Sequence, residues 1–217
     1  MKNCTQDTFN WAVITLGQFS RNKFWGEDVT KSYRGAVCTS TFISGNGAAV
    51  LVDPPFEAVR LAEVLHARTG KTLAEITHVY ITHGHGDHFM ALDCFPNASI
   101  YAAPDEIKKV IENCEQRDGF TPGIIPAKDG FIPGISVIHI PGHTMGICGL
   151  LFDAAEGKVA VVGDAIMTRD FFAAREGYHN SVDFTASTRS IELIADIADI
   201  VVPGHDNYFL TGRNLSR

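Results

Sequence analysis

Residues 83–88 read His-Gly-His-Gly-Asp-His, so four side chains that can bind a metal ion occur within six positions. Imidazole nitrogen and carboxylate oxygen are ligands that Zn²⁺ and other first-row metals accept. A regular helix would spread these side chains around its surface, and a strand would send them to both faces. Because Gly84 and Gly86 let the backbone bend sharply, we predict that the stretch is a loop that wraps a metal ion.

Five apolar segments of the chain are each followed by a histidine or an aspartate. These residues are Asp53, His83, His143, Asp164 and His205. In proteins whose sheets are flanked by helices, ligands gather at the ends of strands. The sequence therefore predicts that these side chains meet the 83–88 loop at one polar edge of the fold.

Hydrophobic periodicity and turn residues predict the elements that position these side chains. Strands are predicted at Cys38–Ser44, Ala48–Val52, Ile76–Thr82, Ala98–Ala102, Ile135–Ile140, Gly149–Phe152, Val159–Val162 and Ile200–Val202. Helices are predicted at Glu57–Thr69, Pro104–Gln116 and Ser187–Ile197, and a further helix could run from Asp87 to Cys94. The turn at Asn46-Gly47 makes the first two strands a hairpin, and residues 121–134, with three prolines and three glycines, are predicted to be loop.

The chain also contains a weak internal repeat. The order strand, Asp53, helix, strand, His83 recurs as strand, Asp164, helix, strand, His205. Two similar halves would bring their polar strand ends to a shared edge. Apolar strands followed by polar residues are common, however, so the duplication is a hypothesis at this point.

The order of the candidate ligands resembles the metallo-β-lactamase fold superfamily, whose pattern is His-x-His-x-Asp-His, then Gly-His, Gly-Asp and a final Gly-His. Here these motifs are residues 83–88, Gly142-His143, Gly163-Asp164 and Gly204-His205, and the resemblance covers residues 38–207. It implies an α/β fold of the αββα type, with two mixed β-sheets packed face to face and helices outside. It also implies one hydrolase domain over residues 1–217, similar to the short single-domain members.

The resemblance assigns a role to each position. The first metal ion would be held by His83, His85 and His143. The second would be held by Asp87, His88 and His205. Asp164 would bridge the two ions, as in the glyoxalase II and lactonase branches of the family. Asp53 is expected to orient a ligand imidazole from outside the metal centre, although it could instead cap the turn before Pro54-Pro55.

The chemistry of such a centre follows from its charge. A divalent ion lowers the pKa of bound water from about 15.7 to about 7, so a metal-bound water can act as hydroxide at neutral pH. Asp87 could also accept a proton. Histidine and carboxylate ligands suit Zn²⁺, Fe or Mn²⁺, and two Zn²⁺ ions are the first expectation.

A substrate pocket is expected beside the metal centre. The segment 168–186 is rich in aromatic residues and could cover the site, although ordinary packing of a long connection would also explain it. The candidate lining residues are Phe89, Met167, Phe171, Phe172, Tyr178 and His179. Quorum-quenching lactonases have a tyrosine three residues after the bridging aspartate, where this chain has Met167.

Three functions are compatible with these motifs, and a fourth, a binding or scaffold role without catalysis, is disfavoured. The first is hydrolysis of a small ester, lactone or thioester by a dinuclear centre. The second is a phosphodiesterase or nuclease, and the third a mononuclear iron dioxygenase acting on persulfides, in which only two histidines and an aspartate bind the iron. A protein that retained only a binding or scaffold role would be expected to have lost ligands, and none is missing here.

Composition sets the remaining expectations. The chain has 217 residues, 45% of them apolar, and a net charge of −7 without a basic run, so nucleic acid is not the expected partner, but a nuclease is not excluded. Five cysteines without a C-x-x-C pair favour reduced thiols in a cytoplasmic protein. No signal peptide or long apolar run is seen, so we expect no membrane association. A small-molecule substrate and a homodimer are expected.

Overall fold

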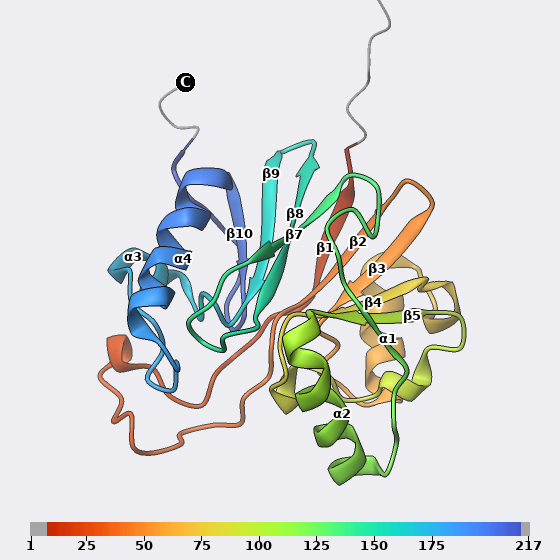
Figure 1. Cartoon of the computed structure of the whole chain (residues 1–217), viewed down its shortest axis with the longest axis horizontal. Coiled ribbons are helices and arrows are strands. Elements are labelled where there is room, and N and C mark those ends of the chain that lie inside the picture. The colour runs from red at the N-terminus through yellow and green to blue at the C-terminus, as the bar shows by residue number, and fades with distance from the viewer. Residues whose placement is uncertain (1–7, 214–217) are drawn as a thin grey trace, which may run out of the picture.

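The computed structural model describes residues 8–213. The first half of the chain supplies a six-stranded sheet and two α-helices (Figure 1). Its strands are β1 (Asn10–Thr15), β2 (Ser40–Gly45), β3 (Ala48–Val52), β4 (His78–Ile81), β5 (Ser99–Ala102) and β6 (Ile124–Pro126), which pair in that order. The helices are α1 (Ala58–Thr69) and α2 (Pro104–Asp118), and short 3₁₀ turns occupy Lys23–Trp25 (η1), Leu73–Glu75 (η2), Gly86–His88 (η3) and Leu92–Cys94 (η4).

The second half of the chain builds a five-stranded sheet. Its strands are β7 (Ile135–His139), β8 (Cys148–Ala154), β9 (Gly157–Gly163), β10 (Ile200–Pro203) and β11 (Phe209–Leu210), paired in the order β11-β10-β9-β8-β7. The helices of this half are α3 (Arg169–Ala174) and α4 (Phe184–Ile197). Figure 1 shows α3 and α4 outside the second sheet and α1 and α2 outside the first.

Both sheets are mixed. The strands from β3 to β6 pair in parallel, as do β9 and β10, and the other neighbours are antiparallel. The sheets pack face to face with helices on the outer sides, so the predicted αββα sandwich is confirmed. The prediction of a single domain is compatible with this arrangement and stays a prediction.

Strand β3 shows why the core strands read as continuous apolar runs. Its Val50 and Val52 face the second sheet, in one cluster with residues such as Leu150 and Val161. The intervening Leu51 lies on the opposite face, in a cluster with Leu61 of α1. Because successive side chains of a strand point to opposite faces and both faces are covered, each position of the strand is apolar.

The two halves share one connectivity. In the first half a hairpin, β2–β3, is followed by α1 and the parallel strand β4. In the second half a hairpin, β8–β9, is followed by α3, α4 and the parallel strand β10. Asp53 and Asp164 come directly after the equivalent strands β3 and β9. The weak repeat in the sequence therefore corresponds to a repeat in topology.

The β2–β3 hairpin and the helices α1 and α2 agree with the sequence predictions within a few residues. Asn46 and Gly47 both have positive φ, 50° and 78°, as the predicted turn requires. The predicted helix from Asp87 to Cys94 is wrong, because this segment forms only the turns η3 and η4. Between them Phe89 is extended and fully buried, and the Met90 amide bonds to the Pro54 oxygen, so tertiary packing prevents a continuous helix.

Four elements were not predicted. Strand β1 pairs antiparallel with β2 at one edge of the first sheet. Strand β6 occupies three residues of the predicted loop 121–134 and pairs with β5 at the other edge of the sheet. Its last residue, Pro126, has no backbone N–H to donate, which is tolerated in an edge strand. The two-residue β11 and the six-residue α3 are too short for a periodic signal.

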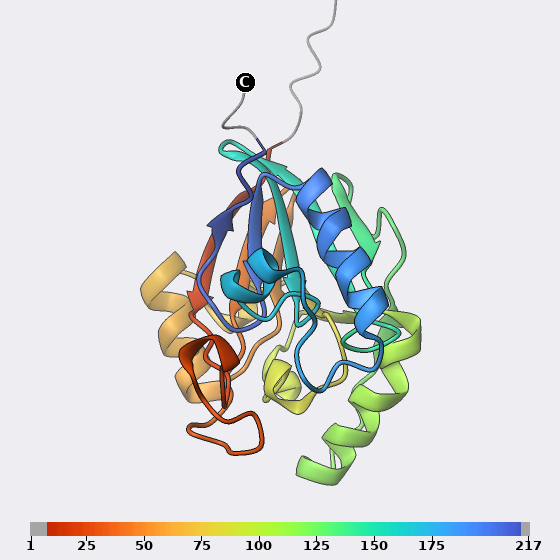
Figure 2. The same ribbon diagram turned by 90° about the vertical axis from the view of Figure 1, so that its left-hand side faces the viewer.

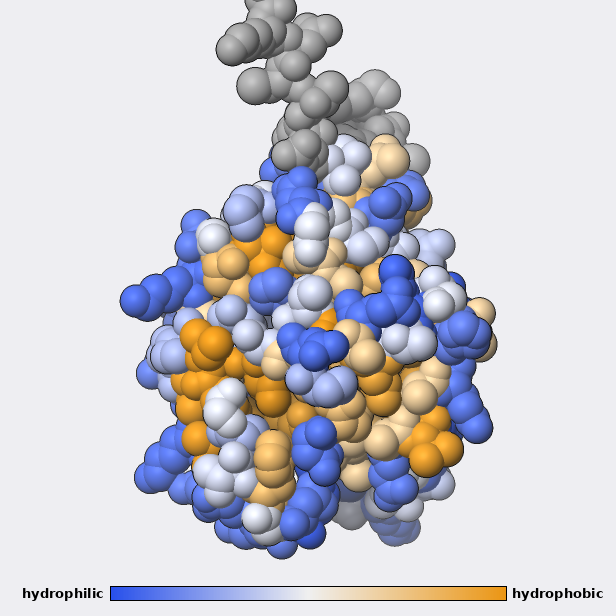
Figure 3. Space-filling model, turned by 90° about the vertical axis from the view of Figure 1, so that its right-hand side faces the viewer, coloured by the Kyte–Doolittle hydropathy of each residue, from blue (hydrophilic) through white to orange (hydrophobic). Residues whose placement is uncertain are grey.

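The remaining surface adds few constraints. In the described part of the chain, no helix is long and apolar enough to cross a membrane. On the side of the molecule that lies at the right in Figure 1, hydrophobic residues are interspersed with hydrophilic ones (Figure 3). Cys38, Cys94, Cys114 and Cys148 are free thiols, whereas Cys4 lies outside the described residues.

One hydrogen bond joins the two sheets through the core. The buried Tyr80 hydroxyl on β4 donates to the Cys148 backbone oxygen on β8, at 3.1 Å. We expect Tyr80→Phe to lower the free energy of unfolding by about 1–3 kcal/mol, because a buried hydrogen bond is lost while the ring stays. Urea unfolding measures this change. The control Tyr208→Phe, at an exposed position, should change stability by less than about 0.5 kcal/mol, and equal stability of both variants would refute the role of the hydroxyl.

Candidate metal centre

The structure brings the seven predicted ligands together. Their ligand atoms form two groups, and within each group all atoms lie within 4.8 Å of one another. The first group is His83, His85, His143 and Asp164. The second group is Asp87, His88 and His205. This division matches the two sets that the family resemblance implied.

Each ligand follows the end of a strand or lies in the short turn behind β4. His83 and His85 follow β4, and Asp87 and His88 form the turn η3. His143, Asp164 and His205 follow β7, β9 and β10 of the second sheet. Because the sheets pack face to face, the carboxyl ends of β4, β9 and β10 meet at one edge of the sandwich, where the site forms.

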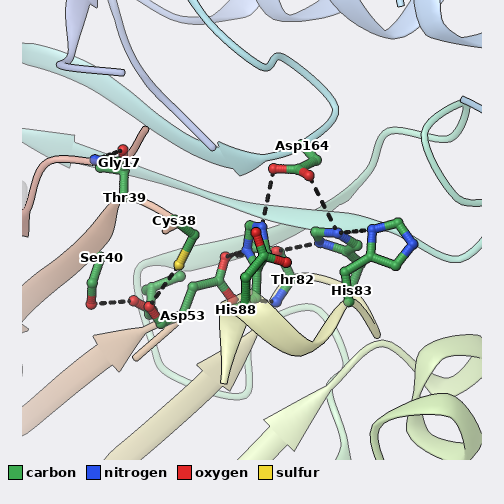
Figure 4. Close-up of polar contacts among 12 residues, drawn as sticks. Gly17, Cys38, Thr39, Ser40, Asp53, Thr82, His83, His88 and Asp164 are labelled. Atoms are coloured by element: carbon green, nitrogen blue, oxygen red, sulfur yellow. Dashed lines mark hydrogen bonds and ion pairs between the residues drawn. The ribbon is translucent and has the colours of Figure 1, made fainter. Parts of the chain in front are cut away.

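Asp164 lies between the two groups. Its Oδ2 is 3.2 Å from His143 Nε2 and 3.7 Å from His83 Nε2. Its Oδ1 is 3.1 Å from His88 Nε2 and 3.2 Å from His205 Nε2. One oxygen therefore faces each group, as a carboxylate that joins two cations must do. Figure 4 shows Asp164 above His83 and His88.

The buried polar atoms of the site fit cations. His88 Nε2 and Asp164 Oδ1 are buried and lie 3.1 Å apart, but neither makes a hydrogen bond of acceptable geometry with any part of the chain that the structure describes. Such unpaired groups are costly in a protein interior. A cation between the groups would give both atoms a partner, and the donor set of imidazole and carboxylate suits a divalent first-row metal.

Burial and charge set the protonation of the site. Burial lowers the pKa of His143 to about 4 and holds the pKa of His83 well below its usual value, so both imidazoles are neutral at pH 7. Burial disfavours the ionised carboxyl of Asp164, but His205, His88 and His143 outweigh this effect and hold its pKa well below the usual range. Burial also disfavours the charged forms of His88 and His205, but nearby acidic groups, Asp164 among them, outweigh it and raise the pKa of both imidazoles. Because metal binds neutral imidazole and ionised carboxylate, these two histidines would release a proton when a metal ion binds.

The second ring nitrogen of three histidines is held by other parts of the fold. His88 Nδ1 lies 2.9 Å from Asp53 Oδ2, and His83 Nδ1 lies 3.1 Å from Thr82 Oγ1. His205 Nδ1 donates to the backbone oxygens of Gln18 and Val37, at 3.0 and 2.9 Å. Because a carbonyl can only accept, Nδ1 of His205 carries a proton, and Nε2 is the nitrogen that a metal ion would bind once the imidazole is neutral.

Asp53 contacts the candidate ligand His88, as expected if its role is to orient a ligand imidazole. Its buried carboxylate accepts hydrogen bonds from the Thr82 amide and hydroxyl, at 2.8 and 2.7 Å, and faces His88 (Figure 4). Its backbone has φ 48°, which is strained for a residue with a side chain. The Cys38 thiol donates to its backbone oxygen at 3.3 Å.

Glu106 of α2 joins two ligand-bearing loops, although the sequence analysis did not single it out. Its Oε2 accepts from the Gly84 amide at 2.8 Å, and its Oε1 accepts from the Thr144 hydroxyl at 2.6 Å. The side chain is buried. An acidic residue in the first turn of a helix is common on protein surfaces, so its position alone gave no signal.

The glycines of two Gly-His motifs lie where a side chain would not fit. A Cβ atom at Gly204 would lie 2.1 Å from Asp164 Oδ1. At Gly142 the φ angle is 137°, and a Cβ atom would lie 2.5 Å from Ser187 Cα on α4. The Gly-His pairs of the sequence thus reflect close approach of the backbone to the site and to α4.

A cavity of about 450 Å³ opens onto the metal groups. Its wall includes Met167 and Tyr178, which the sequence analysis proposed as lining residues. It also includes Phe19, Ser20 and Asn180, which were not predicted. Phe19 and Ser20 belong to the irregular segment between β1 and β2, whose sequence gave no indication of the site.

The other proposed lining residues lie elsewhere. Phe171 and His179 border a second cavity, which shares Tyr178 with the first. Phe89 and Phe172 border neither cavity, contrary to the prediction. Phe89 is fully buried in the core between the first sheet and its helices. Phe172 packs against Phe209, with ring centroids 4.9 Å apart, in the core beneath α4.

Comparison with known proteins agrees with this geometry. The family model described as the metallo-beta-lactamase superfamily matches residues 33–205. Metallo-beta-lactamase domain-containing protein 1 of Xenopus laevis is 30% identical over 164 residues, which are 72% of this chain and 65% of that protein. This chain therefore spans slightly less than two thirds of that relative. An N-acyl homoserine lactonase of a Bacillus species is 25% identical over 176 residues, 76% of this chain and 68% of the lactonase.

A solved structure has the same fold. AidC, a dizinc quorum-quenching lactonase in complex with a product, aligns with a TM-score of 0.61 and 15% identity. The alignment covers 78% of this chain and 72% of AidC.

The bridging position of Asp164 can be tested by metal content. We expect Asp164→Ala to reduce binding from two zinc ions per chain to one or none, because each group loses its shared oxygen. Elemental analysis after zinc loading and dialysis measures the content, with circular dichroism to verify folding. Asp196→Ala, at an exposed position of α4, serves as the control and should keep both ions. Full metal content in a folded Asp164→Ala protein would refute the bridging assignment.

Asp53 should act on metal affinity through His88. We expect Asp53→Asn to weaken zinc binding about 10–100-fold, because the amide no longer holds His88 in the correct tautomer. Competition with a chromophoric chelator measures the affinity, and Asp196→Asn is the control. If Asp53→Asn binds both ions as tightly as the parent protein, Asp53 serves only the turn before Pro54.

Proposed function

The chain belongs to the metallo-beta-lactamase superfamily, and we propose that it is a hydrolase with a dinuclear metal centre that acts on a small ester, lactone or thioester. The observation that carries the proposal is the position of Asp164, whose two oxygens each face one group of ligands. The N-acyl homoserine lactonase relative and the dizinc lactonase AidC support both the two-ion centre and the substrate class.

Two sets of side chains would hold the ions. His83, His85 and His143 would bind one, and Asp87, His88 and His205 the other, with Asp164 shared. Two Zn²⁺ ions are the first choice, and Fe or Mn²⁺ are alternatives for the same donors. Bound divalent ions would lower the pKa of water from about 15.7 to about 7 and so supply hydroxide at neutral pH.

The residues of the chain have separate tasks in this proposal. Asp87 is partly exposed, with 29% of its side-chain surface accessible, and it borders the cavity. It can therefore take up a proton from the attacking water and pass it to the leaving group. Met167, Phe19 and Tyr178 supply an apolar wall opposite the ligands and limit the entry of bulk water.

The shape and charge of the cavity favour a small neutral substrate. Its volume of about 450 Å³ is within the range of small-molecule sites. No lysine or arginine is among the described residues that border it. Phosphodiesters are anions that basic side chains usually bind, so a phosphodiesterase or nuclease is the second candidate.

An iron persulfide dioxygenase is the third candidate. Such a centre would use only His83, His143 and Asp164 or a similar trio, whereas this chain retains both complete groups.

The cytoplasmic location and the homodimer stay predictions.

A substrate panel on metal-quantified protein tests the proposal. We expect about two zinc ions per chain and turnover of aryl esters, lactones or thioesters, with much slower cleavage of bis-p-nitrophenyl phosphate. Removal of metal by a chelator should abolish turnover, and zinc should restore it. Asp164→Ala should be inactive, whereas Asp196→Ala should match the parent protein.

Other outcomes of the panel would reject the proposal in different ways. Preferred cleavage of the phosphodiester would favour the second candidate. One iron per chain, with oxygen uptake on glutathione persulfide, would favour the third.

A further inference from the structure

A second cavity, of about 410 Å³, lies beside the metal cavity. It forms where the segment between β1 and β2 meets α3, α4 and the chain between them, on the side of the molecule that Figure 2 shows. We call it the apolar cavity. Its lining residues are Lys23, Val29, Phe171, Glu176, Gly177, Tyr178, His179, Phe184 and Thr188.

The lining of the apolar cavity leaves large hydrophobic side chains in contact with water. Val29 and Phe184 are 36% and 54% exposed, although both border the cavity. Phe171 is buried but also contributes to its wall. Apolar surface gathered in a hollow is typical of a site that binds an apolar group.

The charged groups at the cavity neutralise each other. Lys23 of the β1–β2 segment and Glu176, which follows α3, both border the cavity and form an ion pair. The Lys23 ammonium also lies over the rings of Phe24 and Phe171, 5.0 and 5.8 Å from their centroids. Partial burial lowers the pKa of His179, which keeps that imidazole neutral at pH 7. The cavity therefore presents no net charge to a ligand.

The apolar cavity adjoins the metal cavity, and Tyr178 is part of both walls. Tyr178 borders both, His179 borders the apolar cavity, and Asn180 borders the metal cavity. The Tyr178 hydroxyl donates to the Arg21 backbone oxygen at 3.0 Å, and its ring packs against Phe19 and Phe171. Residues 178–180 thus run from one cavity to the other, and a molecule that lies along them would place one end at the candidate metal ligands and the other in the apolar cavity.

We propose that the apolar cavity binds an uncharged, apolar arm of the substrate, such as an alkyl acyl chain, while the bond to be cleaved lies at the metal centre. This inference rests on the proposed hydrolase function. It narrows the substrate class to esters, lactones or thioesters with an apolar acyl group of medium length, and it disfavours arms that end in a charge.

A series of p-nitrophenyl esters tests the arm. From butanoate to octanoate we expect kcat/KM of the zinc-loaded enzyme to rise about four-fold per methylene. This factor is about 0.8 kcal/mol per buried CH₂, converted at about 1.36 kcal/mol per ten-fold in rate. The mono-p-nitrophenyl ester of suberic acid, of similar length but with a terminal carboxylate, should show no gain over the butanoate. A flat series, or equal rates for the octanoate and suberate esters, would overturn the proposal.

Variants that fill the apolar cavity test whether the dependence of kcat/KM on chain length arises there. Thr188→Phe on α4 should lower kcat/KM for the octanoate at least ten-fold and leave the acetate ester unchanged. Thr185→Phe, at an exposed position of the same helix outside the cavity lining, is the matched control and should change neither rate. Val29→Trp fills the cavity from the β1–β2 segment and should reproduce the effect of Thr188→Phe if that variant does not fold. Parent-like chain-length dependence in both filling variants would overturn the proposal.

Direct binding separates this inference from the proposed function. If no ester, lactone or thioester is cleaved, the hydrolase proposal fails, and calorimetry with 1-octanol then decides the role of the cavity. Saturable binding that Thr188→Phe weakens at least ten-fold, and Thr185→Phe does not, would support an apolar binding site. No binding, or equal binding by the two variants, would refute it.

Discussion

The buried carboxylate of Asp164 is the constraint on which the site depends. An ionised carboxylate in a protein interior is costly unless charges or dipoles surround it. Here the imidazoles of His83, His88, His143 and His205 converge on it from both sheets. This convergence requires the carboxyl ends of β4, β9 and β10 to meet, which only the face-to-face packing of the sheets allows. The lack of a side chain at Gly204 leaves the room that Asp164 occupies.

Each half of the fold supplies one carboxylate that faces His88. Asp53 and Asp164 follow equivalent strands of the two halves, β3 and β9. One carboxylate faces His88 Nδ1 at 2.9 Å, and the other faces His88 Nε2 at 3.1 Å. Equivalent positions of a repeated topology therefore supply an orienting partner in one half and the central carboxylate in the other. The positive φ of Asp53 is an energetic cost of that position, and the hydrogen bonds from Thr82 stabilise its buried carboxylate.

The segment between β1 and β2 contacts both a candidate metal ligand and the two cavities. Its backbone oxygens at Gln18 and Val37 orient His205. Its side chains also border both cavities, Phe19 at the metal groups and Lys23 and Val29 at the apolar cavity. Hydrogen bonds and the Lys23–Glu176 ion pair tie it to the region around α3. In the proposed function, the affinity for metal and the choice of substrate would both depend on this irregular stretch of chain.

The sequence by itself indicated the seven candidate ligands, the hairpin with its Asn46-Gly47 turn and the helices α1 and α2, because these follow from local spacing and from specific residue types. The type of fold followed from the resemblance of the ligand motifs to those of a known superfamily. Only the tertiary structure decided the rest. The extended, buried Phe89 interrupts the helix predicted from Asp87 to Cys94, because long-range packing outweighs local propensity there. His205 is oriented by backbone oxygens, and because every residue has one, the sequence does not show which of them do so. Which aromatic residues border a cavity, as Tyr178 does, and which fill the core, as Phe172 does, depends on how distant segments pack, and periodicity does not encode that.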